Sequence, residues 1–252
     1  VRCNDKVKFE HFFAKAGNLG ANYIATGHYV RSLYDENTKS WRLFQADDLG
    51  KDQSYFLFTM NQQELEHTLF PLAHLTKAEV REIARQHGLK TSEKAESQEI
   101  CFVADNDHGA FIDRYLPEKP SNQGHFVDSE GNVLGEHLGI HYYTLGQRRG
   151  TGVAAGKKVY VKQINPDNNE IELATDVSLY TQYLTAVDVR WIRRLPSGSK
   201  ISAKIRYRHG GAEATIEYSD INRVKLTFTS AQRAVTPGQA VALILYAMQI
   251  RI

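Results

Sequence analysis

The sequence predicts three parts: an α/β portion, a small mixed central domain and a C-terminal all-β barrel. Helical and strand-like patterns alternate through the first third of the chain, which is typical of an α/β domain. From about Asp107, short elements are separated by turns that contain glycine and proline. After Val159 nearly every segment has the length and turn spacing of β-strands, as in a small barrel or sandwich. We place the domains over residues 1–104, 105–175 and 176–252.

A helix and a buried parallel strand are expected near the start of the α/β portion. Apolar residues recur at helical spacing over residues 7–16, and the pattern stops at Gly17 and Gly20. The apolar run Tyr23–Thr26 then leads into Gly27, as in a buried strand that enters a tight loop. Because ligands of open α/β sheets bind beyond the carboxyl ends of such strands, Gly27 is a candidate for close approach to a ligand. A plain turn glycine explains this residue equally well.

Two further elements of the α/β portion have clear signals. Trp41–Ala46 is predicted to be a strand that leads into the polar turn Asp47–Gly50. Thr76 and Glu79 form the pattern of a capping box, so a helix is expected to begin there and to end before Gly88.

The remainder of the chain is expected to contain mainly hairpins. A short helical stretch ends at Pro117, and a small hairpin surrounds Asp128–Gly131. A second hairpin is predicted for Val159–Ile164 and Glu170–Ala174, around the turn between them. Further strands are expected over Thr185–Ile192, Lys200–Arg208, Ala212–Tyr218, Arg223–Phe228 and Ala240–Ala247.

The composition is that of an ordinary globular protein, with 42% hydrophobic and 24% charged residues. No apolar run approaches the roughly 20 residues that a bilayer span needs, and no signal peptide is recognisable, so a cytoplasmic protein without membrane contact is expected. The net charge of +2 is only mildly basic, so RNA binding must depend on local patches. One basic cluster, equally explained as a solvated strand face, consists of Arg190, Arg193, Arg194, Lys200, Lys204, Arg206 and Arg208.

The chain has two cysteines, Cys3 and Cys101. Two are too few for a disulfide framework, and neither has a Cys or His at zinc-ligand spacing, so no metal site is expected. Isolated cysteines are more often inert core thiols than reactive ones. Cys101 lies in the strand-like run Glu99–Val103, which follows a polar loop where a functional segment is plausible.

Five motifs stand in order along the chain: Val1–Asn4 with Lys6–Phe9, Ala25–Tyr29, Lys51–Leu57, Ser97–Phe102 and Tyr143–Arg148. Together they resemble the bacterial tRNA-specific 2-thiouridylases, which put sulfur on C2 of the wobble uridine. The resemblance extends from Val1 to about Gln239. It implies that the first domain is part of an adenine nucleotide alpha-hydrolase-like fold.

The resemblance also implies a reaction and its residues. ATP, with Mg²⁺, adenylates the uracil O2, and persulfide sulfur then replaces this oxygen. Cys101 resembles the persulfide carrier, and Cys3 resembles the thiol that attacks it and leaves a transient Cys3–Cys101 disulfide. Gly27 matches a nucleotide-contacting glycine. Two tRNA-contacting segments are matched by Lys51, Asp52 and Gln53 and by Arg206 and Tyr207.

The chemistry agrees with this resemblance. Uracil O2 is a poor leaving group until it is adenylated, and thiol–disulfide exchange between two cysteines releases persulfide sulfur. The implied partners are tRNAs for lysine, glutamate and glutamine, and a sulfur donor such as a cysteine desulfurase or a relay protein. Further candidates for RNA contact, with core packing as the alternative for the tyrosines, are Tyr142, Tyr143, Arg148 and Arg149.

The sequence departs from the family pattern in three places. A Ser-Gly-Gly-Val-Asp-Ser-type loop, which cradles the ATP pyrophosphate, has no match in it, so the polypeptide as given is expected to bind ATP poorly and not to turn over. The stretch after Gly150 is short, and residues 246–252 lack the usual glycine cluster. Two alternatives stay open: a non-catalytic RNA-binding fragment and another tRNA-modifying enzyme of the ATP-pyrophosphatase type.

Overall fold

The computed structural model of the chain describes residues 9–90, 92–93, 103, 107–115 and 123–245. The chain divides into two compact units. One comprises Val1–Lys94, Thr185–Thr229 and Gln239–Ile252, and the other comprises Ala95–Leu184 and Ser230–Gly238. Both cysteines lie outside the described residues, as does all of the expected strand Glu99–Val103 except Val103.

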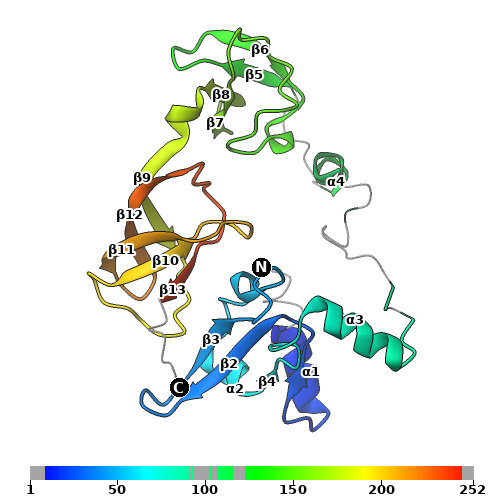
Figure 1. Cartoon of the computed structure of the whole chain (residues 1–252). Helices are drawn as coiled ribbons and strands as arrows, with labels where there is room; N and C mark the ends of the chain where they lie inside the picture. Colours follow the sequence, from blue (N-terminus) through cyan, green and yellow to red (C-terminus); the bar gives the residue numbers. More distant parts are fainter. Residues whose placement is uncertain (1–8, 91, 94–102, 104–106, 116–122, 246–252) are drawn as a thin grey trace. The chain divides into compact units, whose positions relative to one another are not determined.

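The α/β part of the first unit is built from short helices and strands (Figure 1). In chain order they are α1 (Phe12–Asn18), β1 (Ile24–Ala25), β2 (Val30–Asp35), β3 (Ser40–Gln45), η2 (Ser54–Phe56), α2 (Gln62–Glu66), β4 (Thr68–Leu69) and α3 (Lys77–Gln86). Helix α1 ends as the sequence predicts, because Gly20 adopts φ +77° and the Ala21 N–H closes back onto the Ala16 carbonyl at 3.0 Å. The expected parallel strand is confirmed, since β1 pairs in parallel with β4.

Strands β2 and β3 form an antiparallel hairpin that runs from the pair Val30–Gln45 to the pair Asp35–Ser40. The predicted strand Trp41–Ala46 is therefore confirmed, whereas β2 has no clear alternation in the sequence and was not expected. The apolar core beneath this part contains Phe9, Ile24, Val30, Leu57, Met60, Leu65 and Phe70. The predicted capping box of α3 is also present, because the Glu79 carboxylate accepts from the Thr76 N–H at 2.7 Å.

Most of the later strands form one five-stranded sheet in the order β13-β10-β11-β12-β9. Their bounds are β9 (Tyr180–Val187), β10 (Lys200–Lys204), β11 (Ala212–Ser219), β12 (Arg223–Arg233) and β13 (Ala242–Leu245). The expected strand Thr185–Ile192 is wrong in its position, because the chain leaves the sheet at Asp188, whose φ is +54°. Within the described residues the hydrogen-bonded order is linear, with β13 and β9 at its two edges.

The second unit contains a four-stranded sheet in the order β6-β5-β8-β7. It confirms both predicted hairpins, β5 (Gly124–Val127) with β6 (Val133–His137) and β7 (Tyr160–Asn165) with β8 (Glu170–Ala174). Phe126, Val159, Val161, Ile171 and Leu173 form its core. The predicted short helix is α4 (His108–Tyr115), and η4 (Ile140–Tyr142) follows β6. In the described part of the chain, no helix combines the length and apolar character that a membrane crossing requires.

Candidate functional site

The segment Lys51–Gln53 lies in a tightly held loop between β3 and η2. The turn before it closes through Asp48, whose carboxylate accepts from the Gly50 N–H at 3.1 Å and from the Lys77 N–H at 3.1 Å. This second bond fastens the loop to the first residue of α3. The backbone of the predicted RNA-contacting loop is thus fixed before any ligand arrives.

Asp52 is the most buried residue of this loop, with 5% of its surface exposed. Its carboxylate accepts from the Ser54 hydroxyl at 2.8 Å and from the Ser54 N–H at 3.2 Å. The Ala46 N–H and the Gln45 side-chain amide each donate to it at 3.3 Å. Asp52 therefore holds the end of β3 and the start of η2 together, and its flanking residues Lys51 and Gln53 are the more accessible ones.

Lys204, at the end of β10, provides the charge that balances Asp52. Its ammonium lies 3.9 Å from the Asp52 carboxylate, and its side chain is only 11% exposed. A buried carboxylate is strongly disfavoured unless it has donors and a nearby cation, and Asp52 has both. This contact joins the loop to the C-terminal sheet within the first unit.

Aromatic packing makes a second connection between the same two segments. The rings of Phe56 and Tyr207 lie 4.4 Å apart between centroids, and Tyr55 lies 6.3 Å from Tyr207. The buried Tyr55 hydroxyl donates to the Ala240 carbonyl at 2.7 Å. Burial raises the pKa of Tyr55, so this hydroxyl stays protonated and keeps its role as a donor.

The structure therefore brings together the two segments that the sequence assigned to RNA binding. Arg206 and Tyr207 lie just beyond β10, after Ile205, in a turn closed by a 3.0 Å bond from the His209 N–H to the Arg206 carbonyl. Both residues are exposed, and 39% of the Tyr207 surface remains accessible beside Phe56. An exposed aromatic ring next to cationic side chains is the combination that binds unstacked bases and phosphates.

The loop that contains Gly27 is connected to this site by Tyr29, two residues further along the chain. The Gln53 side chain accepts from the Tyr29 N–H at 3.0 Å, and the Gln53 N–H donates to the Tyr29 carbonyl at 2.9 Å. Gly27 itself is exposed, two residues after the end of β1. A Cβ added there would meet only Leu72, at an ordinary contact distance of 3.8 Å, and its φ is not in the left-handed region. The described fold therefore gives no internal reason for a glycine at this position.

The sequence did not predict the structural roles of three residues of the site: Tyr55, Phe56 and Lys204. The dense aromatic run after Gln53 was a usable signal for the first two. Lys204 had none, because it was one of seven cations in the basic cluster and only its burial separates it from the exposed Arg206 and Arg208. The basic cluster is therefore neither wholly a solvated face nor wholly a binding patch.

Cys3 and Cys101, the two residues expected to carry the sulfur, lie outside the described residues. In the ranges that the structure describes, no group of three or more His, Cys, Asp or Glu side chains is arranged to hold a metal ion.

Family profiles match the chain in three consecutive segments. They are described as a tRNA methyl transferase HUP domain over residues 1–105, a tRNA methyl transferase PRC-barrel domain over residues 109–175 and an aminomethyltransferase beta-barrel domain over residues 181–249. The tRNA-specific 2-thiouridylase MnmA of Koribacter versatilis is 45% identical over 247 residues, which cover 96% of this chain and 67% of that protein. The chain belongs to the tRNA-specific 2-thiouridylase family.

Other members of the 2-thiouridylase family match equally well. The proteins of this name from Clostridium kluyveri and Acetivibrio thermocellus are 46% and 44% identical, again over 96% of this chain and 67% of each relative. The chain thus spans about two thirds of the length of these 2-thiouridylases. The matched HUP, PRC-barrel and beta-barrel descriptions agree with the predicted fold class of an α/β portion, a mixed central domain and an all-β end.

Proposed function

We propose that this protein is a tRNA uridine 2-sulfurtransferase, which adenylates the wobble uridine with ATP and replaces its C2 oxygen with persulfide sulfur. Similarity to the 2-thiouridylases along 96% of the chain supports this assignment. The structural observation that supports it most is the meeting of Lys51–Gln53 with Arg206 and Tyr207 in one unit, through Asp52–Lys204 and Phe56–Tyr207. A site that must hold a wobble uridine turned out of its stack needs such a surface.

The residue roles follow from this proposal. Cys101 carries the persulfide and Cys3 releases its sulfur, with a transient disulfide between them as the product of the exchange. Lys51, Gln53, Arg206 and Tyr207 contact the tRNA, whereas Asp52 supports the loop from inside. The working domains are residues 1–104 for the nucleotide and sulfur chemistry, 105–175 as the central domain and 176–252 as the β-domain. The partners are tRNAs for lysine, glutamate and glutamine and a cysteine desulfurase or relay protein, in the cytoplasm.

Gly27 is the described residue that fits contact with ATP. Its loop is fixed, because the Thr26 N–H donates to the Leu69 carbonyl at 3.1 Å and the Thr26 hydroxyl lies 3.0 Å from the His28 ring nitrogen. The exposed glycine therefore presents backbone without a side chain at the carboxyl end of β1, where ligands of α/β sheets bind. When bound, ATP supplies the adenylyl group that turns the uracil O2 into a leaving group.

Gly27→Ala is expected to raise the KM for ATP several-fold in tRNA thiolation without destabilising the fold. The added methyl group meets no close neighbour in the described residues, so the free energy of unfolding should change by less than about 0.5 kcal/mol. Gly17→Ala in α1 is the matched control, since a Cβ at Gly17 meets nothing within 4 Å. An unchanged KM for ATP in Gly27→Ala would remove Gly27 from the nucleotide site.

The function itself is tested by nucleoside mass spectrometry of tRNA treated with the intact protein. Unmodified tRNA is incubated with ATP, cysteine and a cysteine desulfurase, and the expected product is 2-thiouridine that appears only when ATP is present. The parallel reaction contains S-adenosylmethionine in place of the sulfur source, because two matched domain descriptions name methyl transfer. A methylated nucleoside in that reaction, with no thiolated one in the first, would contradict the proposal.

A further inference from the structure

The loop between η4 and β7, residues 147–159, has a firmly anchored base in the second unit. Gln147 closes its entrance, because the side chain accepts from the Thr144 N–H at 3.0 Å and donates to the Arg149 carbonyl at 2.9 Å. The Val161 N–H also donates to the Gln147 carbonyl at 2.9 Å. Val153 and Ala155 pack against the core of this unit, and Val159 belongs to it. The loop is therefore a fixed structure rather than a loose connection.

Glycines allow the backbone turns of this loop and leave parts of its outer surface without side chains. Gly150, Gly152 and Gly156 have φ values of +83°, +69° and +67°, in the left-handed region that disfavours other residues. A Cβ added to Gly152 or Gly156 would meet no atom within 4 Å. The backbone at these positions thus faces open space, where a ligand can approach the peptide groups closely.

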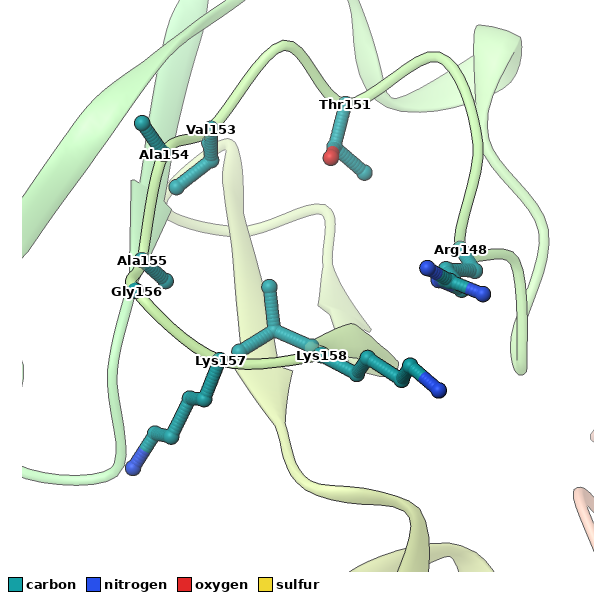
Figure 2. Close-up of a pocket in the computed structure, with 9 residues that line it drawn as sticks. Arg148, Thr151, Val153, Ala154, Ala155, Gly156, Lys157 and Lys158 are labelled. Atoms are coloured by element: carbon teal, nitrogen blue, oxygen red, sulfur yellow. The ribbon is translucent and has the colours of Figure 1, made fainter.

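The loop encloses an open hollow of about 420 Å³, lined by Arg148, Thr151, Val153, Ala154, Ala155, Gly156, Lys157, Lys158 and Val159. Figure 2 shows the chain curling around it, with Lys158 extending toward the side of Arg148 and Lys157 toward the opposite side. The lining contains cations and no carboxylate. Among the residues that the structure describes, no carboxylate forms an ion pair with Arg148, Arg149, Lys157 or Lys158.

We propose that this hollow binds the phosphodiester backbone of the tRNA. Uncompensated cations on a fixed scaffold attract anions, and exposed peptide groups add donors for phosphate oxygens. The lining includes no aromatic side chain on which a base would stack, so the ligand is recognised through phosphate and not through sequence. This proposal rests on the proposed function, because tRNA is the polyanion that such an enzyme binds.

Removal of the two cations on the same side of the hollow tests this site in the intact protein. Arg148→Gln with Lys158→Gln is expected to raise the Kd for unmodified tRNA about tenfold and to reduce the slope of log affinity against log salt by about 1.4 to 1.8, as for two lost phosphate contacts. The exchange of Arg148→Lys with Lys158→Arg retains both charges and should preserve the slope.

Arg81→Gln with Lys90→Gln is the matched control, because both cations are exposed in or just after α3. An equal loss of affinity in this control, or an unchanged salt slope in Arg148→Gln with Lys158→Gln, would overturn the proposal. So would inorganic phosphate that displaces tRNA at constant ionic strength from the unaltered protein, since the ligand would then be free phosphate. If tRNA binds through the loop but gains no sulfur, the proposed function fails and this site stands. If the unaltered protein thiolates tRNA normally but the salt slope of Arg148→Gln with Lys158→Gln is unchanged, this site fails and the proposed function stands.

Discussion

Asp52→Ala is expected to lower the free energy of unfolding by about 3 kcal/mol or more. The substitution removes the acceptor for Ser54, Ala46 and Gln45 and leaves the Lys204 ammonium buried without its counter-charge. Buried donors and a buried cation that lose their partner are not hydrated by solvent, so the cost exceeds that of a surface contact. Chemical denaturation of the intact protein, followed by fluorescence, measures this change.

Two further variants separate the hydrogen bonds of Asp52 from its charge. Asp52→Asn keeps the shape of the side chain and an acceptor for the N–H groups. Lys204→Met removes the cation and leaves in place the groups that donate hydrogen bonds to Asp52. We expect Lys204→Met to cost less than Asp52→Ala, because the carboxylate loses its cation but keeps its hydrogen-bond donors. A double-mutant cycle of Asp52→Asn and Lys204→Met gives the coupling energy of the pair. A cost below about 1 kcal/mol for Asp52→Ala would show that this carboxylate does not hold the loop.

The same variants also report on RNA binding. Because Asp52 fixes the backbone between Lys51 and Gln53, the Asn variant should raise the KM for tRNA at temperatures well below its own melting temperature, where it stays folded. Tyr207 and Phe56 keep their contact in that variant, so the loss should be partial. A change in kcat with no change in KM would place Asp52 outside the positioning of the RNA.

Cys101→Ser is expected to abolish thiolation, and Cys3→Ser is expected to reduce it to background. A serine hydroxyl does not form a persulfide, so the first variant has no carrier for the sulfur. In the second, the persulfide forms on Cys101 but no neighbouring thiolate attacks it. Under the proposed mechanism, the Cys3 thiolate attacks the inner sulfur of the Cys101 persulfide and hydrosulfide leaves. The hydrosulfide then displaces AMP from C2 of the uracil, and a thiol reductant later reduces the Cys3–Cys101 disulfide.

Mass spectrometry of the protein after incubation with a cysteine desulfurase distinguishes the two roles. Cys3→Ser should accumulate one added sulfur atom on Cys101, and Cys101→Ser should show none. Unchanged melting temperatures in both variants serve as the control for folding. Full thiolation by either variant would contradict the assigned pair, whereas sulfur accumulation in the opposite variant would exchange the two roles.

Local signals in the sequence were sufficient wherever an element depends on its own residues. The capping box of α3 and the glycine end of α1 were predictable because each involves groups only a few residues apart. Strand β2 was missed because buried and exposed residues do not alternate strictly along it. It forms a strand because β3 pairs with it along its whole length. The early end of β9 has a similar cause, since the left-handed conformation of Asp188, directly after the strand, is a backbone feature that composition does not signal.

Sequence patterns were enough to assign the family, the order of the three parts and a candidate site that consists of Gly27, Lys51–Gln53, Arg206 and Tyr207. The meeting of Asp52 and Lys204 in the interior, by contrast, is visible only in the folded protein. Strand alternation places Lys204 on the face opposite Ala203, but it does not say what covers that face. A loop from the other end of the chain covers it, and a carboxylate with its own donors makes burial of the ammonium stable. Such pairing between distant segments depends on how the sheet and the loop pack together, which no local pattern in the chain encodes.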